Sequence, residues 1–141
     1  MNDNYLLLLE IARKKKQLGL LDEAIIYYQE ALNKCCSKSE IIWYELGCVY
    51  YKAKKYDQAA YAFNKALEIN DKDYITWYAL GITYKRLKLW NQAVECFKQS
   101  IELNSKYWPA YASLLRTYLR LRQWKEAWHW FKKSLKELKE T

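Results

Sequence analysis

Apolar side chains recur along the chain at the spacing of an amphipathic α-helix. Two segments show this spacing most clearly: Trp43, Leu46, Gly47 and Tyr50 in the first, and Ala59, Phe63, Ala66 and Leu67 in the second. In each segment the positions follow i, i+3 or i+4, and i+7, which places the side chains on one face of a helix. The pattern predicts two helices that pack against each other.

Extended over the whole chain, the same pattern predicts eight helices. They cover residues 6–18, 22–36, 40–53, 57–70, 74–87, 91–104, 108–121 and 124–139. Asp22, Asp57 and Asn91 stand where the second helix of each pair begins, and we expect them to act as N-caps. Pro109 falls in the first turn of a helix, where proline is tolerated.

The pattern repeats every 34 residues. The columns in phase are Trp43, Trp77 and Tyr111; Leu46, Leu80 and Leu114; Tyr50, Tyr84 and Tyr118; Ala59, Ala93 and Ala127; and Phe63, Phe97 and Phe131. A period of this length indicates stacked supersecondary units rather than one irregular globule. One extra residue precedes the second unit, because Ala24 and Ala59 are 35 residues apart.

Each unit reads W-x-x-L-G-x-x-Y followed by A-x-x-x-F, which resembles the tetratricopeptide repeat. The fourth unit departs from the pattern, because Leu115 stands where glycine is expected. The resemblance implies an all-α fold, a right-handed α-solenoid of four helix-turn-helix units in a single domain over residues 1–141. The units cover residues 5–38, 40–73, 74–107 and 108–141.

Aromatic residues make up 17% of the chain, and the repeat assigns most of them to the core. The predicted core rings are Trp43, Trp77, Tyr50, Tyr84, Phe63, Phe97 and Phe131. Gly47 and Gly81, placed against Ala59 and Ala93, are expected to let the two helices of a unit approach closely.

Groups that carry catalysis are scarce. The chain has three widely separated glycines and a single histidine, His129, so no phosphate-binding loop is present and general acid–base capacity is small. Cys35, Cys36, Cys48 and Cys96 form no C-x-x-C pair, and free thiols are expected. We therefore predict a protein that is not an enzyme and has no cofactor, metal site or small-molecule substrate.

Two further patterns bear on where the protein acts. No apolar run is long enough for a membrane span or a signal peptide, which predicts a cytoplasmic protein or one in an organelle stroma. The formal net charge of +8 favours an acidic partner.

By resemblance, the first helix of each unit lines a concave groove, and positions off the core stripe face it. The predicted groove residues are Arg13, Lys16, Ile41, Tyr44, Cys48, Tyr51, Lys52, Ile75, Tyr78, Ile82, Lys85, Arg86, Arg116 and Arg120. They combine apolar anchors with a basic row. This combination predicts a protein or peptide partner that carries apolar and acidic residues.

The sequence therefore favours a non-enzymatic scaffold or adaptor, such as an assembly or chaperone-like factor. A nucleic-acid-associated protein that uses the basic row is the alternative, and a photosynthetic-complex assembly factor is a narrower option. Capture of a chaperone's C-terminal tail is not expected, because Leu9, Arg13 and Glu45 stand where that subclass of repeats needs lysine and asparagine.

The last helix carries three additional rings, Trp124, Trp128 and Trp130. Two arrangements are open: the rings fold back onto the fourth unit, or they form an apolar patch. A patch would make the protein a homodimer through its C-terminal helix or dock it onto a partner.

Overall fold

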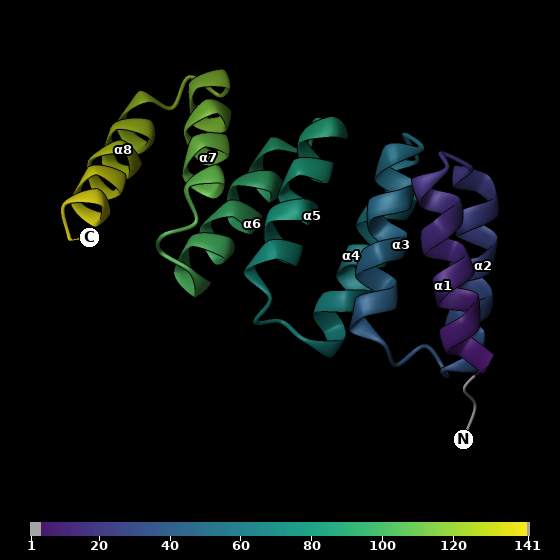
Figure 1. Ribbon diagram of the computed structural model, residues 1–141. Helices are drawn as coiled ribbons and strands as arrows, with labels where there is room; N and C mark the ends of the chain where they lie inside the picture. Colours follow the sequence, from purple (N-terminus) through teal and green to yellow (C-terminus); the bar gives the residue numbers. More distant parts are fainter. Residues whose placement is uncertain (1–3, 141) are drawn as a thin grey trace. The chain divides into compact units, whose positions relative to one another are not determined.

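A computed structural model describes residues 4–140, and eight helices occupy this part of the chain (Figure 1). They are α1 (Asn4–Gln17), α2 (Leu21–Lys34), α3 (Glu40–Lys52), α4 (Tyr56–Ile69), α5 (Tyr74–Arg86), α6 (Trp90–Leu103), α7 (Trp108–Arg120) and α8 (Trp124–Lys139). Each end lies within two residues of its predicted position. The predicted all-α fold of paired helices is confirmed.

The helices form two compact units, divided between Asp71 and Lys72. In the first unit α1 pairs with α2 and α3 with α4, and α2 packs against α3. In the second unit α5 pairs with α6 and α7 with α8, while α7 packs against both α6 and α5. Each unit therefore contains two of the predicted hairpins.

The turn inside every hairpin has the same backbone conformation. Gly19, Lys54, Lys88 and Arg122 occupy it with φ between 56° and 76°. In the second hairpin, for example, the Lys54 N–H donates to the Tyr51 carbonyl and the Lys55 N–H donates to the Tyr50 carbonyl. These are the two bonds of a Schellman motif, so three of the four turns place a basic residue where glycine is most comfortable.

The predicted N-caps of the second helices are wrong. Asp22, Asp57 and Asn91 lie inside the first turns of α2, α4 and α6, and the N-cap residues before them make no side-chain capping bond. Because the Schellman turn fixes where each second helix starts, the cap position falls on the residue after the left-handed one. Side-chain caps occur on first helices instead, from Ser39 to the Ile42 N–H and from Asp73 to the Ile75 N–H.

Within a hairpin, the close approach of the two helices occurs at a phenylalanine ring. A Cβ built on Gly47 would lie 2.7 Å from Phe63 carbons, and one on Gly81 would lie 2.6 Å from a Phe97 carbon. Ala59 is fully buried as predicted, but the rings are the groups that touch the glycines.

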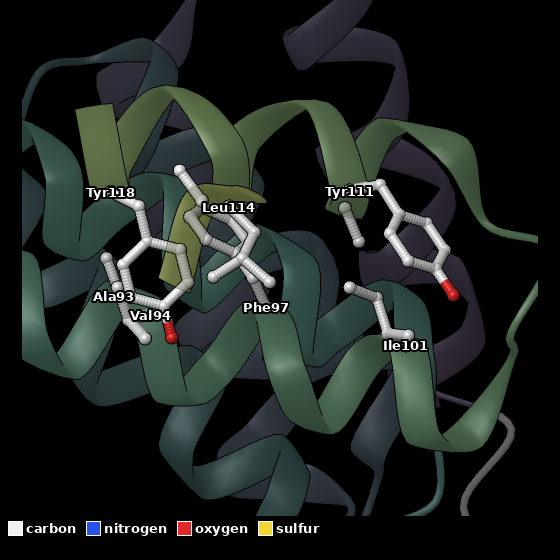
Figure 2. Close-up of a cluster of buried hydrophobic side chains, with 9 residues drawn as sticks. Ala93, Val94, Phe97, Ile101, Tyr111, Leu114 and Tyr118 are labelled. Carbon is white, nitrogen blue, oxygen red and sulfur yellow. The ribbon is translucent and has the colours of Figure 1, made fainter. Parts of the chain in front are cut away.

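In the second unit the core lies between α6 and α7. Figure 2 shows Val94, Phe97 and Ile101 from α6 directed toward Tyr111 and Leu114 of α7. All five side chains are almost completely buried.

The fourth hairpin differs from the others at this point. Leu115 replaces the glycine, and Phe131 is 40% exposed although the sequence assigned it to the core. A leucine side chain fills the space that a ring occupies over Gly47 and Gly81, so Phe131 turns outward and stacks on Trp128 at 5.6 Å between ring centroids.

The extra residue before the second hairpin is accommodated in the turn between α2 and α3. Cys36 and Ser37 are two consecutive residues with φ of 57°. The Ser37 carbonyl accepts a hydrogen bond from the Trp43 indole N–H at 3.0 Å, which fixes the entry to α3.

Candidate functional site

In the first unit, α1 and α3 are joined by an ion pair. The Arg13 guanidinium donates to both carboxylate oxygens of Glu45, with a shortest distance of 2.7 Å, and the buried Tyr28 hydroxyl donates to Glu45 at 2.9 Å. Burial raises the pKa of the Glu45 carboxyl, but the hydrogen bonds from Arg13 and Tyr28 outweigh burial and leave the pKa below its usual value. Arg13, predicted as a cation for a partner, is already neutralised.

Around this pair lies a surface that we call the α1/α3 face: Arg13, Lys16, Tyr44, Glu45 and Cys48. The Tyr44 ring packs on Phe63 at 5.8 Å between centroids, so this predicted anchor is half-buried. Burial raises the pKa of the Cys48 thiol, and Lys16 lies close enough to oppose that effect. Tyr51 packs edge-to-face on Tyr56.

The corresponding α5/α7 face of the second unit consists of Tyr78, Ile82, Lys85 and Arg116. The Tyr78 ring packs on Phe97 at 5.8 Å, which repeats the Tyr44 arrangement. Tyr78 also meets Tyr107 edge-to-face at 5.2 Å, and Ile82 packs against the core of this unit. These residues are therefore half-buried rather than freely exposed.

Two predicted anchors are well exposed. Ile41 at the start of α3 is 55% exposed, and Ile75 at the start of α5 is 40% exposed. Each leaves an aliphatic side chain available at the N-terminal end of a first helix.

The α5/α7 face concentrates positive charge. The pKa of the Lys85 ammonium is lowered by burial first and then by the charges of Arg116 and Arg86. Among residues 4–140, neither Lys85 nor Arg116 is in an ion pair with a carboxylate. In contrast to Arg13, these cations lie close together without an acidic residue of the chain to compensate them.

Arg120 does not extend this cluster into solvent. Its guanidinium lies 4.6 Å from the centroid of Trp90, a cation–π contact between α7 and α6. Lys52, by comparison, is exposed at the end of α3.

Sequence reasoning missed an aromatic column that supports these faces. Tyr56, Trp90 and Trp124 each begin the second helix of a hairpin and are 34 residues apart. Tyr56 receives Tyr51 and Trp90 receives Arg120. The spacing was a usable signal, because the column has the same period as the core.

A cavity of about 350 Å³ opens in the first unit away from these residues. Its lining includes Trp43, Tyr50, Tyr61, Gln29 and Asp57. Trp43 meets Tyr61 edge-to-face at 6.0 Å, and the Gln29 amide donates to the Tyr50 hydroxyl at 2.8 Å. Trp43 is thus half-buried and forms a cavity wall.

Both arrangements expected for the C-terminal rings occur together. Trp130 folds back toward Tyr111, with ring centroids 6.3 Å apart. Trp124 and Trp128 remain 63% and 58% exposed. With Phe131, Leu115 and Leu119 they line a cleft of about 300 Å³ between α7 and α8.

In the part of the chain that the structure describes, His, Cys, Asp and Glu side chains form no group able to hold a metal ion. A search of the same residues finds no helix with the length and apolar character needed to cross a bilayer.

Solved structures with similar folds are numerous. A crystal structure of MamA matches with a TM-score of 0.89 and 23% identity, over 98% of this chain and 80% of that one. MamA 41-end from Desulfovibrio magneticus RS-1 gives a TM-score of 0.83 and 19% identity, over 95% of this chain and 75% of that one. The first tetratricopeptide repeat domain of Spaghetti (RPAP3), bound to the HSP90 peptide SRMEEVD, gives 0.81 and 20% identity, over 86% of this chain and 96% of that one. No curated protein matches the sequence closely.

Family models agree with the repeat pattern. Two models, both described as tetratricopeptide repeat, match residues 41–73 and 74–107 in one case and residues 5–33 in the other. These ranges follow the first three predicted units, and α7 and α8 supply a fourth hairpin with the same type of turn. The chain therefore belongs to the tetratricopeptide repeat family, whose helical hairpins are protein-interaction modules.

Proposed function

We propose that the protein is a non-enzymatic scaffold, with an assembly or chaperone-like role, that holds a partner segment containing apolar and acidic residues. The observation that carries the proposal is the pair Lys85 and Arg116 on the α5/α7 face. They are cations on adjacent first helices, one of them half-buried, and no carboxylate among residues 4–140 pairs with either.

Charge compensation explains why a partner would bind there. Bringing like charges together at a partly buried position disfavours their charged forms, and a carboxylate from a partner relieves that repulsion. The α1/α3 face has no such requirement, because Glu45 already neutralises Arg13. The acidic part of the partner is therefore assigned to the second unit, and exposed Ile41 and Ile75 are assigned to apolar anchors.

One structural neighbour offers a comparison. The peptide bound by the RPAP3 domain, SRMEEVD, contains three acidic residues. In this chain the columns expected to hold a chaperone tail contain Leu9, Arg13 and Glu45, so we propose a different acidic segment held by Lys85 and Arg116.

The proposal is tested with a charge-reversal variant, Lys85→Glu/Arg116→Glu, and a matched control, Lys54→Glu/Lys88→Glu. Both change the net charge equally, but the control residues lie in the hairpin turns. Proteins that co-purify from a native lysate are quantified by mass spectrometry for wild type and both variants. We expect a set of partners to be lost from the first variant and kept by the control, whereas identical partner lists for all three proteins would contradict the proposal.

Binding to single-stranded poly-uridine RNA distinguishes the nucleic-acid alternative. A protein that binds RNA through the basic row shows affinity that falls steeply with salt, in proportion to the phosphates contacted. We expect weak retention that the control variant reduces as much as Lys85→Glu/Arg116→Glu does.

A further inference from the structure

An uninterrupted apolar stripe runs along the exposed side of α8. Its members are Trp124, Trp128, Phe131, Leu135 and Leu138, which are 63%, 58%, 40%, 41% and 53% exposed. They follow the spacing i, i+4, i+7, i+11 and i+14, which keeps them in line along one face of a helix. Ala127 and Ser134, on the adjacent face, are buried.

Elsewhere in the chain, the equivalent stripe is covered by a helix. Trp128, Phe131 and Leu135 correspond, 34 residues earlier, to Val94, Phe97 and Ile101. Those three side chains are 5%, 0% and 1% exposed, because α7 packs over them (Figure 2). In the first unit α3 packs in the same way on α2. The repeat therefore shows which kind of element fits this face: an α-helix with small and apolar residues.

The charges beside the stripe select the kind of helix. On a helical projection Lys125, Lys132, Lys136 and Lys139 lie together along one border of the stripe, while α7 forms the other. All four lysines are exposed, and the Lys132 ammonium lies 5.9 Å from the Trp128 ring. A helix that covers the stripe therefore places one of its own borders along a row of positive charge.

A second copy of this chain does not meet that requirement. Two copies of α8 packed face to face would bring two lysine rows together. The other candidate, α1 of a second copy, carries Lys14 in the column of Val49 and Thr117. Those residues are 0% and 1% exposed in α3 and α7, so Lys14 would be buried against the tryptophans of α8.

We propose that the α8 stripe binds an amphipathic helix of another polypeptide, with an apolar stripe bordered by acidic residues. The cleft of about 300 Å³ between Leu115, Leu119, Trp128 and Phe131 receives an apolar anchor of that helix. The lysine row pairs with its carboxylates. This surface is separate from the α5/α7 face and does not depend on the function proposed for it.

The probe is a fluorescein-labelled peptide based on residues 107–122, which contain the helix that covers the equivalent stripe of α6. One version has Arg116, Arg120 and Arg122 replaced by glutamate, and the other has them replaced by lysine. Binding to the full chain is measured by fluorescence anisotropy. Because complementary charge sets the preference, we expect the acidic peptide to bind at least about tenfold more tightly than the basic one.

Three variants locate the site. Lys132→Glu/Lys136→Glu/Lys139→Glu is expected to invert the preference between the two peptides. Trp128→Ser/Leu135→Ser is expected to abolish binding of both, whereas Ile26→Ser/Ile69→Ser, which removes exposed apolar side chains from the first unit, leaves binding unchanged. Circular dichroism confirms that each variant is folded, and Lys85→Glu/Arg116→Glu leaves peptide affinity unchanged.

Two results would overturn this inference. One is equal or absent binding of the acidic and basic peptides. The other is a concentration-dependent dimer of the wild-type chain, detected by light scattering and abolished by Trp128→Ser/Leu135→Ser, which would show that a second copy occupies the stripe.

Discussion

The ring of Phe63 rests directly on the backbone of Gly47, in space that a methyl group at residue 47 would need. A Cβ there would lie 2.7 Å from two ring carbons, and Phe63 is 1% exposed, so the ring cannot move into solvent. The same pairing occurs between Gly81 and Phe97. Close contact between the two helices of a hairpin thus depends on glycine facing phenylalanine.

Gly47→Ala is expected to destabilise the protein. Alanine favours a helix over glycine by about 1 kcal/mol, but overpacking a dense core costs about 1–3 kcal/mol, so the net change is a loss of up to about 2 kcal/mol. Urea denaturation measures the change. In the double variant Gly47→Ala/Phe63→Leu the loss should be smaller than the sum of the single losses, and strict additivity would show that the ring is not the obstacle.

Glycine is expected to stabilise the hairpin turns. Lys54→Gly, Lys88→Gly and Arg122→Gly each relieve a left-handed residue, which we expect to raise the free energy of unfolding by about 1 kcal/mol per site. Thermal denaturation is the measurement. Lys65→Gly, inside α4, serves as the control and should lose about 1 kcal/mol.

The ion pair between Arg13 and Glu45 should contribute stability that depends on pH. Because the folded-state pKa of Glu45 is lowered, its contribution is present above the unfolded-state pKa of about 4.3 and is lost as the pH falls through the lower folded-state value. Arg13→Met should therefore cost about 1 kcal/mol near neutral pH and much less near pH 3. A destabilisation that is the same at both pH values would contradict this account.

The four cysteines should react with a thiol reagent at different rates. Cys36 is exposed, whereas burial raises the pKa of Cys48 and raises that of Cys96 to about 12. Since the thiolate is the reactive form, we expect Cys36 to react first at pH 8 and Cys96 only on unfolding. The time course with dithionitrobenzoate, compared with Cys36→Ser, measures this order. Rapid reaction of Cys96 in the folded protein would be inconsistent with its burial.

Tyr111→Phe should leave stability unchanged or increase it by about 1 kcal/mol. The Tyr111 hydroxyl is buried and has no hydrogen-bond partner among the described residues. Removing it relieves an unsatisfied polar group while the ring keeps its contacts with Trp108 and Trp130. Thermal denaturation of the variant is the check, and a clear loss of stability would indicate that the hydroxyl is solvated.

The sequence predicted the helices well because core spacing and period both depend on local residue identity. It placed the N-caps at Asp22 and Asp57 wrongly, since the backbone of a Schellman turn, rather than a side chain, sets where α2 and α4 begin. Phe131 was assigned to the core because its column is constant, and the single change at Leu115 was enough to move it outward.

The candidate faces were predicted in membership but not in chemistry. A list of cations does not show which of them find a carboxylate: Arg13 meets Glu45 across two hairpins, whereas Lys85 meets Arg116. Both outcomes depend on how neighbouring first helices align, which a single repeat does not encode. The half-burial of Tyr78 likewise depends on Tyr107, a residue of the linker before α7.

The turn at Cys36 and Ser37 has a practical consequence. One additional residue there is accommodated by two left-handed backbone conformations, and the helices on both sides keep their packing. The junction between the first two repeats is therefore a natural place to insert an epitope or a fluorescent label. Such a reporter would leave α8 and the α5/α7 face untouched.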